Sequence, residues 1–254
     1  MMEHPTVFLT GATGKLGKNI ALGFASLGCQ LILPIRSEQT GYELAMKCKQ
    51  AGSKEVHLIQ VDLTEDNSAD KIQTWLNDHE IFPNILVNNA RNLNYLRNDK
   101  GIVSRENWKG EMLLDVIIPY ELTMLLAQLP GSTLKKVINI SSIYGITVPN
   151  LKLYDNPDSD SSINYGVAKA ALIHLTKELA VRLASKEIEV NSISFGGVEG
   201  RVKEDFLTKY KNLCPAEKML SEDQIFGTVK FLAFNDSNGM TGHNLVMDGG
   251  WTVW

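Results

Sequence analysis

Tyr165, Lys169 and Ser142 have the side-chain types and the spacing needed for proton transfer to or from a carbonyl group. Tyr165 and Lys169 stand four positions apart, so on a helix the phenol and the ammonium share a face. A nearby cation favours the phenolate form of a tyrosine, which makes the side chain a usable proton donor or acceptor at neutral pH. Ser142 ends an apolar, strand-like run and supplies a hydroxyl that can polarise a carbonyl oxygen.

A glycine-rich segment near the N-terminus predicts a nucleotide site. The residues TGATGKLG at 10–17 follow an apolar run of strand length. Glycines in such a turn let the backbone approach a pyrophosphate, whose charge the following helix N-terminus favours. A nicotinamide held there can exchange hydride with a carbon whose oxygen lies at Ser142 and Tyr165. Each motif is common by itself, and their conjunction in this order carries the interpretation.

The order of these motifs resembles the short-chain dehydrogenase/reductase family from one end of the chain to the other. The resemblance implies one Rossmann-type domain, NAD(H) or NADP(H), and a catalytic set of Asn, Ser, Tyr and Lys. The segments that carry it are TGATGKLG at 10–17, DL at 62–63, LVNNA at 86–90, NISS at 139–142, YGVAK at 165–169, NSIS at 191–194 with the glycines at 196 and 197, TG at 241–242 and MDGG at 247–250.

The resemblance also implies roles for individual residues. It makes Ser142, Tyr165 and Lys169 catalytic, and it places Asp115 in the same set, at the usual Asn position. The substrate would lie against Arg91, Ser142 and Tyr165, and no metal site is expected. The expected cofactor contacts are Gly11, Thr13, Gly14, Lys15, Leu16, Arg36, Asp62, Leu63, Asn89, Ala90, Tyr165, Lys169 and Val198.

The choice of nucleotide depends on the end of the second expected strand. NAD-preferring relatives carry an acid at the position that Ile35 occupies, and here Arg36 follows it. An arginine binds a 2′-phosphate in a bidentate way, and Lys15 adds a second cation nearby. NADP(H) is therefore favoured over NAD(H), against the alternative that both cations are solvated surface residues.

Two departures from the family pattern lie close to the expected chemistry. Trp108 and Pro119 match the motif W-x6-N-x3-P, but Asp115 replaces its Asn, which in the family helps to hold a water of a proton relay. Arg91 replaces the glycine that usually ends NNAG. One alternative is therefore a catalytically weak cofactor-binding subunit or sensor. Another is a nucleotide-sugar epimerase or dehydratase, although 254 residues leave no separate C-terminal substrate domain.

Apolar runs of strand length alternate with longer amphipathic stretches along the chain, which predicts an α/β fold. Such an alternation is typical of a doubly wound parallel sheet, here of about seven strands, covered by helices on both faces. We expect one domain over 1–254. The expected strands are 6–10, 31–35, 56–61, 85–87, 137–140, 190–193 and 245–247, and the expected helices are 16–27, 38–51, 66–78, 104–128, 163–185 and 222–234.

A polar segment at 148–164 separates Ser142 from Tyr165 by more residues than the family usually has, which indicates an insertion beside the pocket. Its side chains are rich in hydrogen-bonding groups and poor in apolar ones, which favours a sugar-derived, anionic substrate gripped by Arg91 and this segment. The chain is also similar to family members from bacterial surface-sugar and flagellin-modification pathways.

Composition excludes several classes of partner. A net charge of −4 without long Lys/Arg runs argues against nucleic acid and membrane surfaces. The N-terminus has no signal-peptide pattern, so a cytoplasmic protein is expected. Cys29, Cys48 and Cys214 show no metal-binding spacing and are expected to be free thiols. The resemblance implies a homodimer or homotetramer.

Overall fold

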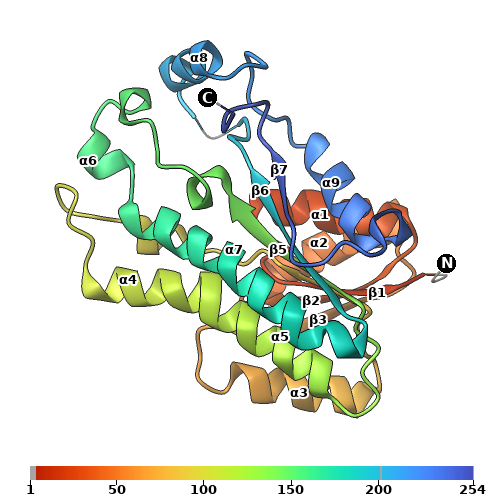
Figure 1. Ribbon diagram of the computed structural model, residues 1–254. Helices are drawn as coiled ribbons and strands as arrows, with labels where there is room; N and C mark the ends of the chain where they lie inside the picture. Colours follow the sequence, from red (N-terminus) through yellow and green to blue (C-terminus); the bar gives the residue numbers. More distant parts are fainter. Residues whose placement is uncertain (1–3, 201, 254) are drawn as a thin grey trace.

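The protein is built on one seven-stranded parallel sheet with the strand order β3-β2-β1-β4-β5-β6-β7 (Figure 1). The structure, a computed structural model, describes residues 4–200 and 202–253. The predicted doubly wound parallel fold is confirmed, with strand bounds within one or two residues of most of the expected runs. The strands are β1 (Thr6–Leu9), β2 (Gln30–Ile35), β3 (Val56–Gln60), β4 (Ile85–Asn88), β5 (Lys136–Ser142), β6 (Glu189–Phe195) and β7 (Asn244–Met247).

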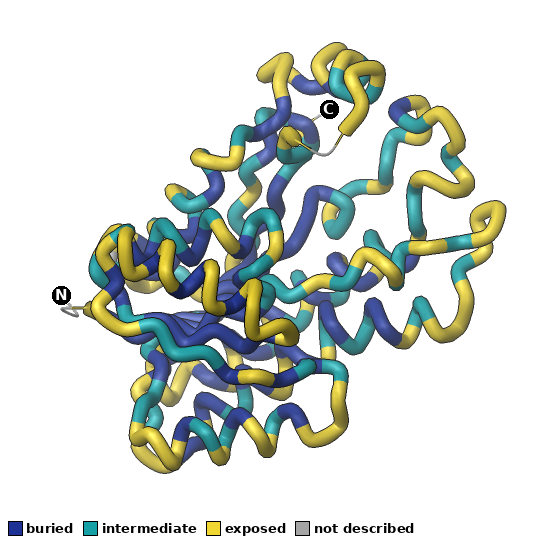
Figure 2. Tube along the Cα trace, turned by 180° about the vertical axis from the view of Figure 1, so that it is seen from behind, coloured by how far each residue is buried: buried dark blue, intermediate teal, exposed yellow. Residues whose placement is uncertain are grey.

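Helices bury both faces of the sheet (Figure 1, Figure 2). One face packs against α1 (Lys15–Ser26), α2 (Glu38–Ala51) and α9 (Gln224–Ala233), and the other against α3 (Ser68–His79), α5 (Ile118–Gln128) and α7 (Ile163–Leu183). Helix α4 (Arg105–Met112) precedes α5 and packs against α7. Along β1, Val7 and Leu9 enter the first core while Phe8 enters the second. Successive side chains of a strand point to opposite faces, so a strand buried on both sides reads as one continuous apolar run.

The expected helix over 104–128 forms, but with a π-helical turn inside it (Figure 1). A π-helical turn over Leu113–Ile117 separates α4 from α5, and the Ile118 N–H bonds to the Leu113 carbonyl, a step of five residues. Pro119 explains the π turn, because proline has no N–H for the carbonyl of Asp115 and its ring would clash with that carbonyl in a regular α-helix. The wider turn that results carries Asp115.

Two elements outside the expected set lie beyond the carboxyl ends of the strands (Figure 1). Segment 148–164 holds a 3-10 turn, Leu151–Leu153, and the short helix α6 (Pro157–Asp160). Helix α8 (Glu204–Leu213) follows β6 and buries only one of its residues, Tyr210. Its apolar residues Phe206, Leu207, Tyr210 and Leu213 recur at helical spacing, so the sequence held a signal for this helix that the expected set left out.

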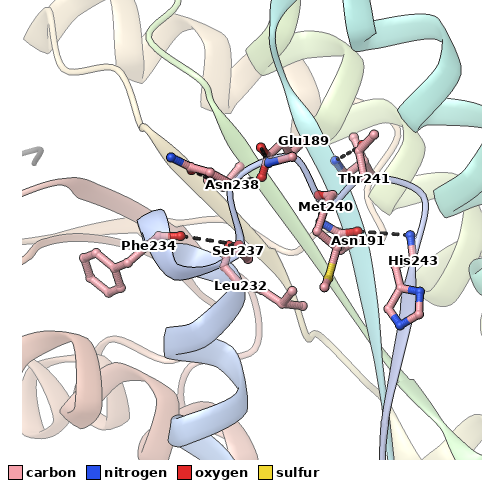
Figure 3. A network of polar contacts seen from close by, with 12 residues as sticks. Glu189, Asn191, Leu232, Phe234, Ser237, Asn238, Met240, Thr241 and His243 are labelled. Atoms are coloured by element: carbon pink, nitrogen blue, oxygen red, sulfur yellow. Dashed lines mark hydrogen bonds and ion pairs between the residues drawn. The ribbon is translucent and has the colours of Figure 1, made fainter.

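Side-chain hydrogen bonds attach the connection between α9 and β7 to strand β6 (Figure 3). Asn191 donates to the Met240 carbonyl at 2.6 Å and accepts from the His243 N–H at 3.0 Å. Thr241 Oγ1 accepts from the Val190 N–H, and Glu189 accepts from the Gly239 N–H. These bonds fix the register of β7 at the edge of the sheet. Among the described residues, no helix is both long and apolar enough to cross a bilayer.

Candidate active site

The turn between β1 and α1 leaves room for a phosphate group. Gly11 has φ +64°, and a Cβ there would stand 2.7 Å from the Cα of Ala90. A Cβ on Gly17 would collide with the Gly11 carbonyl. Both the turn at Gly11 and the helix at Gly17 therefore need a residue without a side chain. Helix α1 starts at Lys15 after Gly14, with no acidic residue in its first turn. Its free N–H groups are suited to an anion, as a dinucleotide pyrophosphate requires.

Hydrogen bonds from Asn89 and Ala90, which follow β4, fix the conformation of this turn. Asn89 Nδ2 donates to the carbonyls of Thr10 and Gly11, each at 3.1 Å. The backbone N–H groups of Asn89 and Ala90 both donate to Thr10 Oγ1. The side chain of Asn89 is thus used to shape the turn, while Gly11, Thr13, Gly14 and Leu16 lie at its surface or at the start of α1.

Arg36 and Asp62 lie close together at the ends of β2 and β3. Partial burial disfavours the charged form of Asp62, but hydrogen bonds from Thr64 and the field of Arg36 outweigh it and lower the pKa of this carboxyl group. Asp62 Oδ1 accepts from the Thr64 N–H at 2.9 Å, which fixes the turn that carries Leu63. Arg36 itself is exposed and is free to meet a ligand phosphate.

Lys15 differs from its expected role as a second cation beside Arg36. Its ammonium donates to the Val198 carbonyl at 3.3 Å and lies 3.5 Å from the Glu222 carboxylate. Asn19 also donates to Glu222, at 3.0 Å. Lys15 therefore ties helix α1 to the segment after β6, and the argument for a 2′-phosphate rests on Arg36.

Ser142 and Tyr165 line one cavity of about 300 Å³ beyond the sheet edge. Ser142 is the last residue of β5, and its Oγ accepts from the Tyr144 N–H at 3.2 Å. Tyr165 comes from the first turns of α7. Arg91 lies over the ring of Tyr165, with the guanidinium carbon 4.2 Å from the ring centre, and the Gly197 backbone forms another part of the wall.

Lys169 stands one helical turn beyond Tyr165, and its ammonium is 5.8 Å from the centre of the Tyr165 ring. The side chain is almost fully buried and donates to Asp115 Oδ1 at 2.8 Å and to the Ile140 carbonyl at 3.0 Å. Asp115 therefore contacts this lysine directly, at the position where the family pattern has an Asn that helps to hold a relay water. Asp115 and Lys169, which are 54 positions apart, meet because α7 packs against the π turn.

Glu111, which the motif analysis did not single out, lies beside this ion pair. Glu111 is 1% exposed and Asp115 is 2% exposed. Burial and the neighbouring Asp115 carboxyl raise the pKa of Glu111 to about 7, against the opposing fields of Arg91 and Lys169. The sequence offers one weak sign of it: Glu111 precedes Asp115 by four positions, in the direction of a shared helix face.

A buried amide chain holds the strands and α7 in register around these groups. Asn88 Nδ2 donates to Asn139 Oδ1 at 2.8 Å, and Asn139 Nδ2 donates to Thr176 Oγ1 at 2.9 Å. Thr176 in turn donates to the Leu172 carbonyl. The chain joins β4, β5 and α7, the three elements that carry or flank the catalytic candidates.

Aromatic side chains, which the sequence did not indicate, form much of the pocket wall beside the polar groups of segment 148–164. The wall includes Tyr144, Tyr154, Phe206 and Tyr210, which come from segments far apart in the sequence. The hydroxyl groups of Tyr144 and Tyr154 share a 2.8 Å hydrogen bond. Burial of the Tyr144 hydroxyl and, to a smaller extent, the neighbouring Tyr154 raise the pKa of Tyr144, so this phenol stays protonated.

Segment 148–164 sends few of its polar groups inward. Asp160, Ser161 and Ser162 line the cavity, whereas Asp155, Asn156, Asp158 and Ser159 are exposed to solvent and do not line it. Asn164 is buried and donates to the carbonyls of Tyr95 and Asn107. At the rim, Lys209 of α8 pairs with Asp155 at 2.9 Å and with Asp205 at 2.8 Å.

Comparison with known proteins assigns the family. The family model described as enoyl-(acyl carrier protein) reductase matches residues 11–252. The chain belongs to the short-chain dehydrogenase/reductase family. The match spans both the glycine-rich turn and the Ser142, Tyr165 and Lys169 region, so the chain is an NAD(P)-dependent oxidoreductase that acts on CH–OH and carbonyl groups.

Three relatives illustrate the range of this family. The chain is 27% identical to post-translational flagellin modification protein A of Campylobacter coli, over 99% of both chains. It is 24% identical to a 7α-hydroxysteroid dehydrogenase of Bacteroides fragilis, over 99% of this chain and 95% of that one. A short-chain dehydrogenase from Leptospira borgpetersenii, solved with bound NAD⁺, is 26% identical with a TM-score of 0.86 and covers 98% of this chain and 93% of its own.

Proposed function

We propose that this short-chain dehydrogenase/reductase oxidises or reduces a sugar-derived, anionic substrate and prefers NADP(H) to NAD(H). The observation that carries the proposal is the position of Arg91, whose guanidinium lies over the Tyr165 ring at the wall of the pocket. A cation there can pair with a carboxylate of the substrate while the reacting carbon lies at Ser142 and Tyr165. The family usually has glycine at this position.

Ser142, Tyr165 and Lys169 are assigned complementary roles. The Ser142 hydroxyl donates to the substrate oxygen, and Tyr165 gives a proton to that oxygen during reduction or removes one during oxidation. Lys169 supplies a positive charge near the Tyr165 ring, which stabilises negative charge that develops at this site during the reaction. The nicotinamide supplies or accepts the hydride when it is bound. Residues that would hold it are the glycine turn, Arg36, Asp62, Leu63, Ala90, Lys169 and Val198, with Tyr165 at the reacting end.

The lining of the pocket suits a compact, polar ligand better than a long apolar one. About 300 Å³ is at the small end of ligand pockets. Three of its rings carry phenol hydroxyls besides Tyr165, and Asp160, Ser161 and Ser162 add acceptors and donors for sugar hydroxyls. The relative named for flagellin modification agrees with this class, and the hydroxysteroid relative defines the contrasting apolar one.

Nicotinamide absorbance with paired substrates tests the proposal. We expect NADPH oxidation with keto-sugar acids, at a lower KM than with the matching neutral keto-sugars. Arg91→Gln should raise KM for the acids at least about tenfold, the effect of losing one charge-assisted contact, and should change KM for the neutral sugars less than about threefold. Arg105→Gln, an exposed change on α4, is the control. Equal effects of Arg91→Gln on both substrates, or a preference of the wild type for long apolar ketones, would refute the proposal.

The Asp115–Lys169 ion pair favours a second candidate, a cofactor-binding subunit with little turnover. Asp115 neutralises part of the charge that should favour the Tyr165 phenolate. This candidate predicts tight binding of NADPH or NAD⁺ by direct titration, together with no turnover on the acid and neutral panels.

We also propose a single domain over 1–254 that works in the cytoplasm as a homodimer or homotetramer. Exposed apolar side chains on α7, among them Ile163, Val167 and Val181, support self-association. Sedimentation of the purified chain tests the assembly.

A further inference from the structure

Glu111 and Asp115 form a buried carboxyl pair next to the proposed proton-transfer residues. Glu111 comes from α4, Asp115 from the π turn, and the two side chains are within hydrogen-bonding reach of each other. Asp115 Oδ1 is bonded to Lys169, but Asp115 Oδ2 and Glu111 Oε1 are both buried and have no hydrogen-bond partner among the described residues. Two ionised carboxylates at this distance repel each other, and an unsatisfied buried acceptor is costly.

One proton held between the two carboxyl groups removes both problems. It supplies the missing donor, and it leaves the pair with a single negative charge. The formal charges around Glu111 then favour the singly charged pair. Arg91, from the segment after β4, and Lys169, from α7, contribute two positive charges, and the pair contributes one negative charge. The ring of Tyr95 lies against Gly110 of α4, next to Glu111 in the chain.

A small cavity on the Asp115 side of the pair offers room for a water beside Lys169. A cavity of about 10 Å³, which is room for about one water molecule, is bounded by Thr10, Asn88, Asp115 and Lys169. Asn88 Oδ1 is a third buried acceptor without a partner among the described residues. A water in that cavity can link Asp115 to Lys169 by a second path.

We propose that Glu111 and Asp115 share one proton and that this pair is the internal proton store for Tyr165. During reduction, the carbonyl carbon gains the hydride, Tyr165 gives its proton to the carbonyl oxygen, and Lys169 relays a proton toward the Tyr165 oxygen. The pair gives its proton to Lys169 and is left with both carboxylates ionised until it takes up a proton from solvent. Oxidation of an alcohol runs these transfers in reverse. Glu111 acts through Asp115 and Lys169, so it is a positioning residue.

Infrared difference spectroscopy tests the shared proton without any substrate. We expect the wild type at pH 6 to show the C=O stretch of a buried protonated carboxyl group, which Glu111→Gln abolishes and which fades as the pH is raised. Glu106→Gln, an exposed change on the same helix, should leave the band unchanged. A wild type without this band, or a band that persists in folded Glu111→Gln, would overturn the proposal.

The role in proton supply rests on the proposed function and is tested separately. On any substrate that the wild type reduces, Glu111→Gln should lower kcat about tenfold or more at pH 6, where the pair holds its proton, with KM within about threefold, and this difference should shrink as the pH rises through about 7; general acid–base groups typically contribute 10² to 10⁴. A fall in kcat by the same factor at every pH would mean that Glu111 is only structural. If no sugar is a substrate, the infrared result still decides whether the proton is shared.

Discussion

Tyr165 lies between two cations that reach it from different elements. Arg91 covers a face of its ring, while Lys169 approaches from the next turn of α7. The Tyr165→Phe variant removes only the ionisable oxygen, so it should lower kcat by about 10² to 10⁴ while NADPH affinity changes less than about threefold. Titration of nicotinamide fluorescence and turnover assays measure the two quantities. Near wild-type kcat would exclude Tyr165 from the chemistry.

Arg36 is the residue on which the nucleotide preference depends, because the ammonium of Lys15 is engaged elsewhere. Arg36→Asp should weaken NADPH binding by about 2 kcal/mol, the size of one hydrogen bond to a charged group, and should improve NADH binding. Direct titrations of both nucleotides measure the change. Lys47→Asp, an exposed change of equal charge on α2, is the control. A wild type that already binds NADH more tightly would show that Arg36 does not meet a 2′-phosphate.

The catalytic candidates were predictable from sequence because each belongs to a short motif that keeps its local structure. Ser142 ends a strand, and Tyr165 and Lys169 share one helix. Glu111 was not predictable in the same way. Its neighbours depend on the π turn over Leu113–Ile117, which changes the angle between the side chains before the turn and those after it. The direct contact of Asp115 with Lys169 also depends on how α7 packs on that turn.

At the scale of elements, the packing of α7 on β5 depends on the buried hydroxyl of Thr176. Thr176→Val keeps the shape but leaves the Asn139 amide without its acceptor, so the free energy of unfolding should fall by about 1–3 kcal/mol. Urea denaturation measures it. Thr123→Val is the matched control, because buried Thr123 donates only to the nearby Pro119 carbonyl. A loss at Thr176 no greater than at Thr123 would show that the amide chain does not secure α7.

For the whole molecule, the parallel sheet and the helices on both of its faces could be predicted from the alternation of apolar runs, whereas the composition of the pocket could not. Tyr144, Tyr154, Phe206 and Tyr210 converge from segments up to 66 positions apart, and no local pattern links them. The composition of 148–164 likewise did not show which of its polar side chains line the pocket. An exposed segment and a ligand-binding segment have similar residues, and only the fold decides which side chains turn inward.

The raised pKa of Glu111 makes the stability of the folded chain depend on pH. The folded state holds a proton that the unfolded state has lost, so this contribution is complete below the ordinary carboxyl pKa and disappears as the pH rises through about 7. Between pH 5 and 8, the free energy of unfolding should fall on the order of 1–3 kcal/mol more in the wild type than in Glu111→Gln. Urea titrations across that range measure it, with Glu106→Gln as the control. Parallel curves for the wild type and Glu111→Gln would contradict it.

The ion pair between Asp155 and Lys209 joins segment 148–164 to α8 across the rim of the pocket, and both side chains are partly exposed to solvent. Dissolved ions screen such a pair, because the Debye length falls from about 10 Å at 0.1 M to about 3 Å at 1 M ionic strength. Raising the salt concentration should therefore loosen the rim, and amide hydrogen exchange in segment 148–164 should become faster. In the Lys209→Met variant, the amide hydrogens of segment 148–164 should exchange quickly at every salt concentration. The Lys211→Met variant, an exposed change on α8, should behave like the wild type. Salt-independent exchange in the wild type would mean that packing alone closes the rim. If the pair does close it, the ionic strength of the surroundings sets how often the pocket opens to its substrate.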